Sequence, residues 1–231
     1  MHIMEGFLPH PWWEIWYALS LPVVAYGVHK MNRMFKDNRE TLPLLAVAGA
    51  FIFVLSSLKL PSVTGSCSHP TGTGLGAVLF GPAIAAVLGT IVLIYQALFL
   101  AHGGLTTLGA NVFSMGISGP AVAYLVYRAS AKSNLNFFAS IFLAATVADL
   151  ATYVVTSFQL ALAFPAETGG VLQSFYAFGA VFAVTQVPLA VLEGVITALI
   201  FKYIIQIKGD VMVKLDVISE TKLRILQGAL Q

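Results

Sequence analysis

The sequence predicts an all-α, polytopic membrane protein of about seven transmembrane helices. Of its 231 residues, 58% are hydrophobic and only 10% are charged, and the mean hydropathy is +0.86. Soluble domains carry roughly 25% charged residues, so a soluble fold of this size could not bury so many apolar side chains. Apolar stretches of about 20 residues, the length that crosses the hydrocarbon core of a bilayer, recur along the chain.

The crossings can be located from the apolar stretches and from the residues that interrupt them. The continuous candidates are residues 11–29, 42–58, 109–127, 135–164 and 175–207. A further apolar stretch, 74–100, is interrupted by Gly81 and Pro82, and a proline in a helix interior breaks or kinks the helix. We therefore expect two short crossings within 72–103, which gives seven crossings in total.

Lysine and arginine predict the orientation, because these residues accumulate on the cytoplasmic side of a membrane. They crowd residues 30–39, recur at 128–132 and return in 202–224. We therefore expect these segments and the C-terminus in the cytoplasm, and the N-terminus and the loop 59–73 outside. An odd number of crossings must separate that outer loop from the inner loop near residue 130, and the two short crossings together with the crossing 109–127 make three.

We expect three parts in the chain: an N-terminal metal-chelating segment 1–10, a transmembrane domain 11–207 and a cytoplasmic amphipathic tail 208–231. The first residues lack the basic region of a secretory signal and carry Glu5 instead. The single cysteine, Cys67, excludes an internal disulfide framework. The net charge of +2 reflects lysines and arginines at the membrane edges and does not indicate a nucleic-acid partner.

The position of His2 gives the first indication of chemistry. Directly behind the first residue, a free terminal amine, the amide nitrogen of residue 2 and its imidazole can reach one metal ion through fused chelate rings. A second imidazole would complete four nitrogens in a plane, a geometry that favours Ni(II) or Cu(II). The amide must lose its proton, so binding should weaken in acid. Met1 must also be retained without a formyl group.

Several histidines could supply the second imidazole. His69 lies in the polar loop LPSVTGSCSHPTGTGLG, residues 60–76, on the same predicted face as the N-terminus. His10 lies at the edge of the first crossing, and His102 also falls outside if there are seven crossings. His29 lies on the opposite face. From the residues alone these alternatives stay open, and so does an ordinary extracellular turn.

Two acidic residues, Asp149 and Glu193, fall within predicted crossings. Intramembrane acids are costly and are candidates for function, so a proton-coupled secondary transporter of a metal or small organic substrate is an alternative. The structural interpretation, which we favour, is that each carboxyl group accepts hydrogen bonds from neighbouring hydroxyl groups. An intramembrane enzyme built on Ser68, His69 or Cys67 is disfavoured, because no complete nucleophile–base–acid set is evident. The chain contains no Walker A sequence and hence no ATP site of that kind.

Three stretches, MHIMEGFLP, SCSHPTGTGLG and GGLTTLGANVFSMGISGP, together resemble the CbiM/NikM family, the substrate-binding components of energy-coupling-factor transporters for cobalt and nickel. The resemblance covers most of the chain. It implies seven membrane helices and an N-terminus that folds back into the protein. Matched by motif, the implied metal ligands are the Met1 amine, the amide and imidazole nitrogens of His2, and His69. Candidates for supporting those ligands by hydrogen bonding are His102, Asn111 and Ser68.

The resemblance also implies a substrate and partners. Ni2+ or Co2+ is the transported ion, and the chain is a transport subunit, not an enzyme. Family members work with a transmembrane coupling subunit, two cytoplasmic ATPase subunits and a small CbiN/NikN-like membrane protein. The expected location is the inner or plasma membrane of a prokaryote. A planar four-nitrogen site leans towards nickel, but the sequence does not decide between the two ions.

Overall fold

The structure, a computed structural model, describes residues 2–37, 39–61, 66–133 and 135–230, and it is predominantly helical, as predicted. A 3-10 turn, η1 (Arg39–Thr41), precedes α2, and a π-helical turn, η2 (Val112–Ser118), joins α5 to α6. Three short strands, β1 (His2–Ile3), β2 (Leu60–Pro61) and β3 (Ser66–Ser68), form one sheet. The helices are α1 (Trp12–Asp37), α2 (Leu42–Ser57), α3 (Thr73–Phe80), α4 (Pro82–Phe99), α5 (Leu108–Asn111), α6 (Gly119–Lys132), α7 (Phe137–Ala163), α8 (Gly170–Lys214) and α9 (Glu220–Gly228).

The helices have the length and the surface of membrane-spanning segments. Among the described residues, five stretches are long and apolar enough to cross a bilayer: Arg39–Ser57, Pro82–Phe99, Leu108–Lys132, Phe137–Ala163 and Gly170–Lys214. With 26 residues, α1 is also long enough to cross a bilayer. It is not among these five stretches, and its first half is rich in tryptophan and tyrosine, which are less apolar than leucine or valine. Large apolar side chains point outward along the helices, including Leu125, Leu172 and Val184. A soluble bundle would not expose so many of them, so the chain is an all-α, multi-pass membrane protein.

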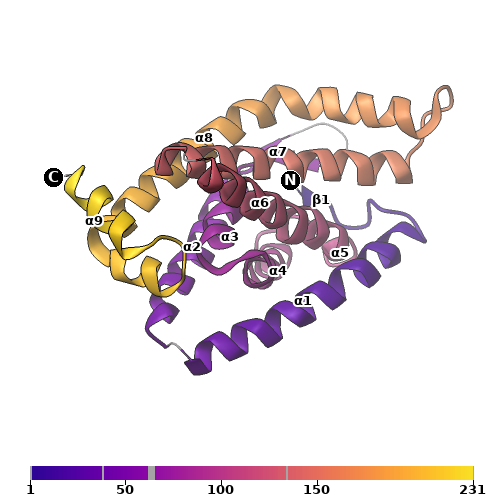
Figure 1. Ribbon diagram of the computed structural model, residues 1–231. Coiled ribbons are helices and arrows are strands. Elements are labelled where there is room, and N and C mark those ends of the chain that lie inside the picture. The colour runs from indigo at the N-terminus through magenta and orange to yellow at the C-terminus, as the bar shows by residue number, and fades with distance from the viewer. Residues whose placement is uncertain (1, 38, 62–65, 134, 231) are drawn as a thin grey trace.

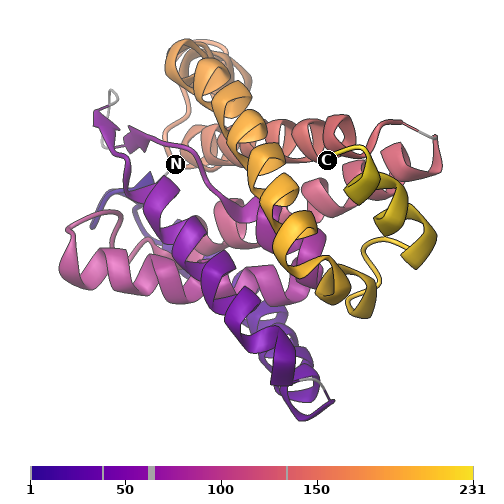
Figure 2. The same cartoon turned by 90° about the vertical axis from the view of Figure 1, so that its left-hand side faces the viewer.

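The bundle has two ends that differ in charge. At one end lie β1, α5 and the turn between α7 and α8, and at the other lie the α1–α2 connection, α9 and the C-terminus (Figure 1). The lysines and arginines of residues 30–39, 128–132 and 202–224 belong to the second end, which Figure 2 turns towards the viewer, and only Lys59 lies beside the strands. We call these two regions the strand end and the basic end.

The predicted break at Gly81 and Pro82 is confirmed, and it has an unexpected consequence. Gly81 has a φ of +83°, which favours glycine, and Pro82 begins α4, where its missing N–H costs no hydrogen bond. On the other side of the break, α3 has only eight residues, all buried, and spans about 12 Å. It therefore cannot cross a bilayer alone, unlike the 18-residue α4.

The chain ahead of α3 supplies the missing length. Residues 69–72 form neither helix nor strand, yet every one of them is buried. Figure 2 shows this non-helical stretch running from β3 into the bundle, where α3 continues it. Non-helical backbone is tolerated at membrane depth only where protein covers it and satisfies its polar groups. Here α8 supplies the polar partners, because Glu193 binds Thr71 and Gly72 and Gln186 binds the carbonyl of His69, while α2, α4, α6 and α7 pack around α3.

Local signals set the remaining boundaries. The Asn136 side chain accepts hydrogen bonds from the backbone N–H groups of Phe138 (2.9 Å) and Ala139 (3.3 Å), and so caps α7. Lys208 interrupts α8 with non-helical backbone angles, at the predicted start of the tail. Beyond it, α9 packs back on α8, where Gln227 Nε2 donates to the carbonyl oxygen of Ile205 at 3.0 Å.

Candidate metal centre

The small sheet places the N-terminal residues inside the protein. β1 pairs antiparallel with β3, and His2 lies opposite Cys67. β2 covers the other edge of β3. His2 and Ile3 are completely buried. A chain terminus is usually frayed, so its burial in a paired strand shows that the N-terminal segment is part of the folded structure.

Asn111 clamps this strand from the opposite side. Its Oδ1 accepts a hydrogen bond from the N–H of Ile3 at 2.7 Å, and its Nδ2 donates to the carbonyl oxygen of Ile3 at 3.0 Å. The Thr107 hydroxyl donates to the same carbonyl at 2.7 Å. All backbone polar groups of Ile3 are therefore satisfied by the chain around α5. Because residue 3 is fixed at both groups, the position of His2 is fixed as well.

Four buried side chains converge at the end of this strand. The metal-binding atoms of His2, Cys67, His69 and His102 all lie within 4.8 Å of one another. The shortest separation, 2.5 Å, joins His2 Nδ1 to His69 Nε2. Two nitrogens that each bind one ion at about 2.0 Å and at a right angle lie roughly 2.8 Å apart. At 2.5 Å the two nitrogens lie slightly closer than that, near enough for both to bind one ion after a small adjustment.

The backbone around His69 orients its ring. Its Nδ1 lies 2.8 Å from the carbonyl oxygen of Pro70. A hydrogen bond there places the proton on Nδ1 and leaves Nε2 as a free electron pair facing His2. Gln186 on α8 donates from Nε2 to the carbonyl oxygen of His69 at 3.0 Å. These contacts hold the imidazole in the tautomer that a metal ion requires.

Burial keeps the imidazoles neutral. Desolvation, reinforced by the neighbouring imidazoles, lowers the pKa of His2 well below the usual value of 6.5. Burial also lowers the pKa of His102 to about 4. Since a protonated imidazole has no electron pair for a metal, these histidines are ready to act as donors at neutral pH.

Cys67 is a member of the cluster that the sequence analysis did not include among its candidate ligands. Its sulfur lies 2.9 Å from His102 Nε2, and burial raises the pKa of the thiol. The thiol therefore stays protonated and can donate to the imidazole of His102. The signal available in the sequence was its spacing, two residues before His69 in the same loop. His102, expected to support the ligands, belongs to the cluster itself.

The structure places the other candidate residues as follows. Ser68 accepts a hydrogen bond from the hydroxyl of Thr185 at 2.7 Å and so ties β3 to α8, away from the imidazoles. His10 is exposed and contacts Glu14 at 2.5 Å, outside the cluster. His29 lies on α1 near the basic end. Met1, the implied donor of the terminal amine, lies outside the described residues.

The two intramembrane acids both support the segment that carries His69. Glu193 accepts hydrogen bonds from the hydroxyl of Thr71, at 3.0 Å, and from the N–H of Gly72, at 2.9 Å. Asp149 accepts one from Gln186, at 2.7 Å, and Gln186 in turn binds the carbonyl of His69. The prediction that each carboxyl group accepts a hydrogen bond from a neighbouring hydroxyl group is thus confirmed for Glu193. Asp149 also accepts a hydrogen bond, but its donor is the side-chain amide of Gln186.

A buried cluster of metal-binding side chains at one end of a multi-pass helical bundle is the architecture of a membrane protein that handles a metal ion. Comparison with known proteins identifies it as a transport protein and not an enzyme. Residues 2–211 match the family CbiM, described as "Cobalt uptake substrate-specific transmembrane region". The chain therefore belongs to the CbiM family.

Individual relatives give the same result. A Methanosarcina barkeri protein named for cobalt transport, CbiM 2, is 66% identical over 99% of both chains. A Methanocorpusculum labreanum protein named as a fused cobalt transport protein, CbiMQ, is 54% identical over 98% of this chain and 38% of its own length. A crystal structure titled as a truncated transition metal transporter superposes with a TM-score of 0.77 at 30% identity, covering 88% of this chain and 98% of the other.

Proposed function

We propose that the chain captures Ni2+ or Co2+ as a transport substrate at the strand end. The proposed ligands are the Met1 amine, the amide and imidazole nitrogens of His2, and the imidazole of His69. One observation carries the proposal: His2, second in the chain, is buried on a paired strand with its Nδ1 2.5 Å from His69 Nε2. Only at position 2 do a terminal amine, an amide and an imidazole adjoin.

Cys67 and His102 flank this ligand set in the proposal and do not complete it. The thiol and the imidazole are paired with each other at 2.9 Å, so neither presents an unengaged donor to the ion. The set is then made of nitrogen atoms, which suit both nickel and cobalt. The family description and the names of the relatives refer to cobalt, whereas a planar four-nitrogen set leans towards nickel. Titration of both ions against one preparation decides between them.

We further propose seven crossings, with the strand end outside and the basic end in the cytoplasm. The seven are α1, α2, the buried stretch 69–72 with α3, α4, the continuous α5–α6 helix, α7 and α8. Four non-helical residues at up to about 3.3 Å each and eight helical residues at about 1.5 Å each give up to about 25 Å, most of the roughly 30 Å hydrocarbon core. The lysines and arginines gathered at the basic end support the orientation.

The energy for uptake is proposed to come from other proteins. The chain has no Walker A sequence, and the fused CbiMQ relative carries a related sequence within a longer chain. We infer an importer in which a transmembrane coupling subunit, two cytoplasmic ATPase subunits and a small CbiN/NikN-like protein act with this chain in a prokaryotic inner or plasma membrane. The alternative, proton-coupled uptake through Asp149 and Glu193, predicts transport into proteoliposomes by this chain alone under a pH gradient.

Isothermal titration of the purified protein tests the capture site. The wild-type chain should bind about one Ni2+ or Co2+ ion per molecule. A variant with one extra residue ahead of Met1 should lose binding because the amine is displaced, and His2→Ala and His69→Ala should lose it because imidazole donors are removed. His10→Ala, which removes an exposed histidine outside the cluster, should bind normally. Normal binding by the extended variant or by His2→Ala would refute the terminal chelate.

A further inference from the structure

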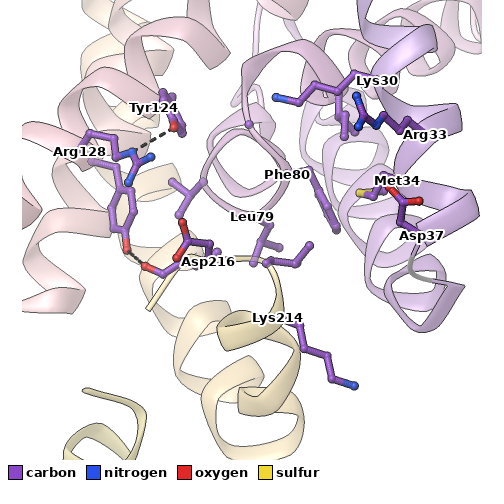
Figure 3. A pocket seen from close by; sticks show the side chains of 16 residues that line it. Lys30, Arg33, Met34, Asp37, Leu79, Phe80, Tyr124, Arg128, Lys214 and Asp216 are labelled. Carbon is purple, nitrogen blue, oxygen red and sulfur yellow. Dashed lines mark hydrogen bonds between the residues drawn. The ribbon is translucent and has the colours of Figure 1, made fainter. Parts of the chain in front are cut away.

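A cleft of about 490 Å3 opens at the basic end, far from the candidate metal centre. It lies between the C-terminal ends of α1 and α6, with the end of α3 above it and the segment after α8 below (Figure 3). Much of its apolar lining comes from the α3–α4 region, and its charged residues come from α1, α6, the end of α8 and the segment after it. The apolar residues there include Val78, Leu79, Phe80 and Ile84.

Cationic side chains face this cleft from two walls. Lys30 and Arg33 project from α1 on one side, and Arg128 projects from α6 on the other (Figure 3). Among the residues that the structure describes, none of these three forms an ion pair. A fourth cation of the lining, Lys214, is paired with Glu40. The cleft therefore holds three cations that form no direct ion pair with a described residue.

Arg128 is already held in position for a ligand. Its Nε donates a hydrogen bond to the hydroxyl of Tyr124 at 3.0 Å, and its guanidinium carbon lies 5.3 Å from the centre of the Tyr124 ring. This arrangement uses Nε and leaves the two terminal nitrogens of the guanidinium. Because that group is planar and pre-oriented, it can bind two oxygens of a phosphate side by side.

Two carboxylates limit the charge that the cleft can accept. Asp37 and Asp216 also line it, and neither forms an ion pair with a described residue. Three unpaired cations against two unpaired carboxylates leave one net positive charge. A singly charged phosphodiester matches that balance, whereas a doubly charged phosphate monoester would leave an excess of negative charge.

We propose that this cleft binds the phosphate group of an anionic phospholipid from the surrounding leaflet. Basic pockets between membrane helices on the cytoplasmic side bind phospholipid headgroups, and the apolar wall beside the cations gives the glycerol and the upper acyl chains a surface to contact. The headgroup would lie against Arg128 and Arg33, with Lys30 beside it. The shared chemistry is a phosphate ester, so a soluble phosphate compound is the other source to be distinguished.

Native mass spectrometry and thermal unfolding of the full chain in detergent test this site. The probes are phosphatidylglycerol, phosphatidylcholine and inorganic phosphate. We expect phosphatidylglycerol to bind and to raise the unfolding temperature more than phosphatidylcholine does. Arg33→Gln and Arg128→Gln should each weaken phosphatidylglycerol binding about fivefold, since one cation near a lipid phosphate contributes about 1 kcal/mol. Arg128→Lys should also weaken phosphatidylglycerol binding, because lysine keeps the charge but lacks the two side-by-side donors of the guanidinium group.

The matched controls are Lys36→Gln and Arg39→Gln, which remove cations at the same end that do not line the cleft; both should bind phosphatidylglycerol as the wild type does. Co2+ titration of every variant serves as the test of folding and is expected to be unchanged. If inorganic phosphate displaces the lipid, the phosphate chemistry is supported and soluble esters share the site. Equal effects of cleft and control variants, or no effect of Arg128→Gln on folded protein, would overturn the proposal.

Discussion

Glu193 is the residue whose replacement should most affect the metal centre without touching it. Its Oε2 accepts a hydrogen bond from the N–H of Thr71 at 2.5 Å, and its Oε1 accepts from the N–H of Gly72 at 2.9 Å and from the Thr71 hydroxyl at 3.0 Å. These three donors belong to the buried stretch that follows His69. The position of that imidazole therefore depends on a carboxyl group of α8, far away in the sequence.

The size of the effect follows from the contacts. Glu193→Ala would leave the three donors of Thr71 and Gly72 buried without an acceptor. Each such loss costs about 1–3 kcal/mol, so the stretch would be destabilised by about 3–6 kcal/mol after some relaxation. If metal binding must restore the order of this stretch, each 1.4 kcal/mol lowers the affinity tenfold. We therefore expect the affinity for Co2+ or Ni2+ to fall by at least about a hundredfold.

Isothermal titration together with thermal unfolding in detergent measures this effect. Glu193→Gln keeps one acceptor oxygen and should show an intermediate loss of metal affinity. This variant can still be measured if Glu193→Ala does not fold. Thr197→Val is the matched control, because Thr197 lies one turn away on α8 and its buried hydroxyl has no hydrogen-bond partner among the described residues. Its affinity should stay within about threefold of wild type. Near-normal binding by folded Glu193→Gln and Glu193→Ala would refute the anchoring role.

Three further predictions concern the site and its support. Asn111→Ala removes both hydrogen bonds to Ile3 and should lower metal affinity about 10–100-fold in titration; an unchanged affinity would contradict the clamp. Gly104→Ala would place a methyl group against Glu5, 2.4 Å from its Cα, so it should expose the N-terminal segment to proteolysis, whereas Gly179→Ala, with open space around it, should not. Burial lowers the pKa of His102 to about 4, below the 6.5 of the unfolded chain, which therefore binds more protons in that interval. The metal-free protein should lose stability as the pH falls from about 7 to about 4, measured by denaturation, and the slope should be smaller in His102→Ala.

The sequence predicted much of the helical framework because length and hydropathy determine it. The break at Gly81 and Pro82 was visible because both residues act through local backbone geometry. A short crossing ahead of this break was predicted, but not that its helix, α3, has only eight residues and continues a non-helical stretch. A hydropathy pattern records apolar residues, and the non-helical stretch 69–72 ahead of α3 is buried only because Glu193 and Gln186, far away in sequence, satisfy its polar groups.

The candidate site divides in the same way. His2 could be selected from coordination chemistry, because its value lies in its place in the chain. That His2 lies near His69 could be predicted from the expected topology together with the family resemblance. The pairing of Cys67 with His102 could not be found by those arguments, because it depends on the register of β1 against β3 and on the turn after α4. Such contacts are set by tertiary packing and leave no periodic pattern in the sequence.

The buried stretch and α3 also connect the two ends of the molecule physically. The stretch begins at His69 in the metal centre, is held at Thr71 and Gly72 by Glu193, and continues as α3 to the cleft at the basic end. Every residue of α3 is buried, so this helix cannot shift without repacking its neighbours, since protein interiors are close-packed. A displacement of α3 along its axis would act on the Glu193 hydrogen bonds before it reached His69. The anchoring carboxyl group therefore lies at the point where any movement of α3 would be transmitted to a proposed metal ligand, which is a second reason to measure its replacement first.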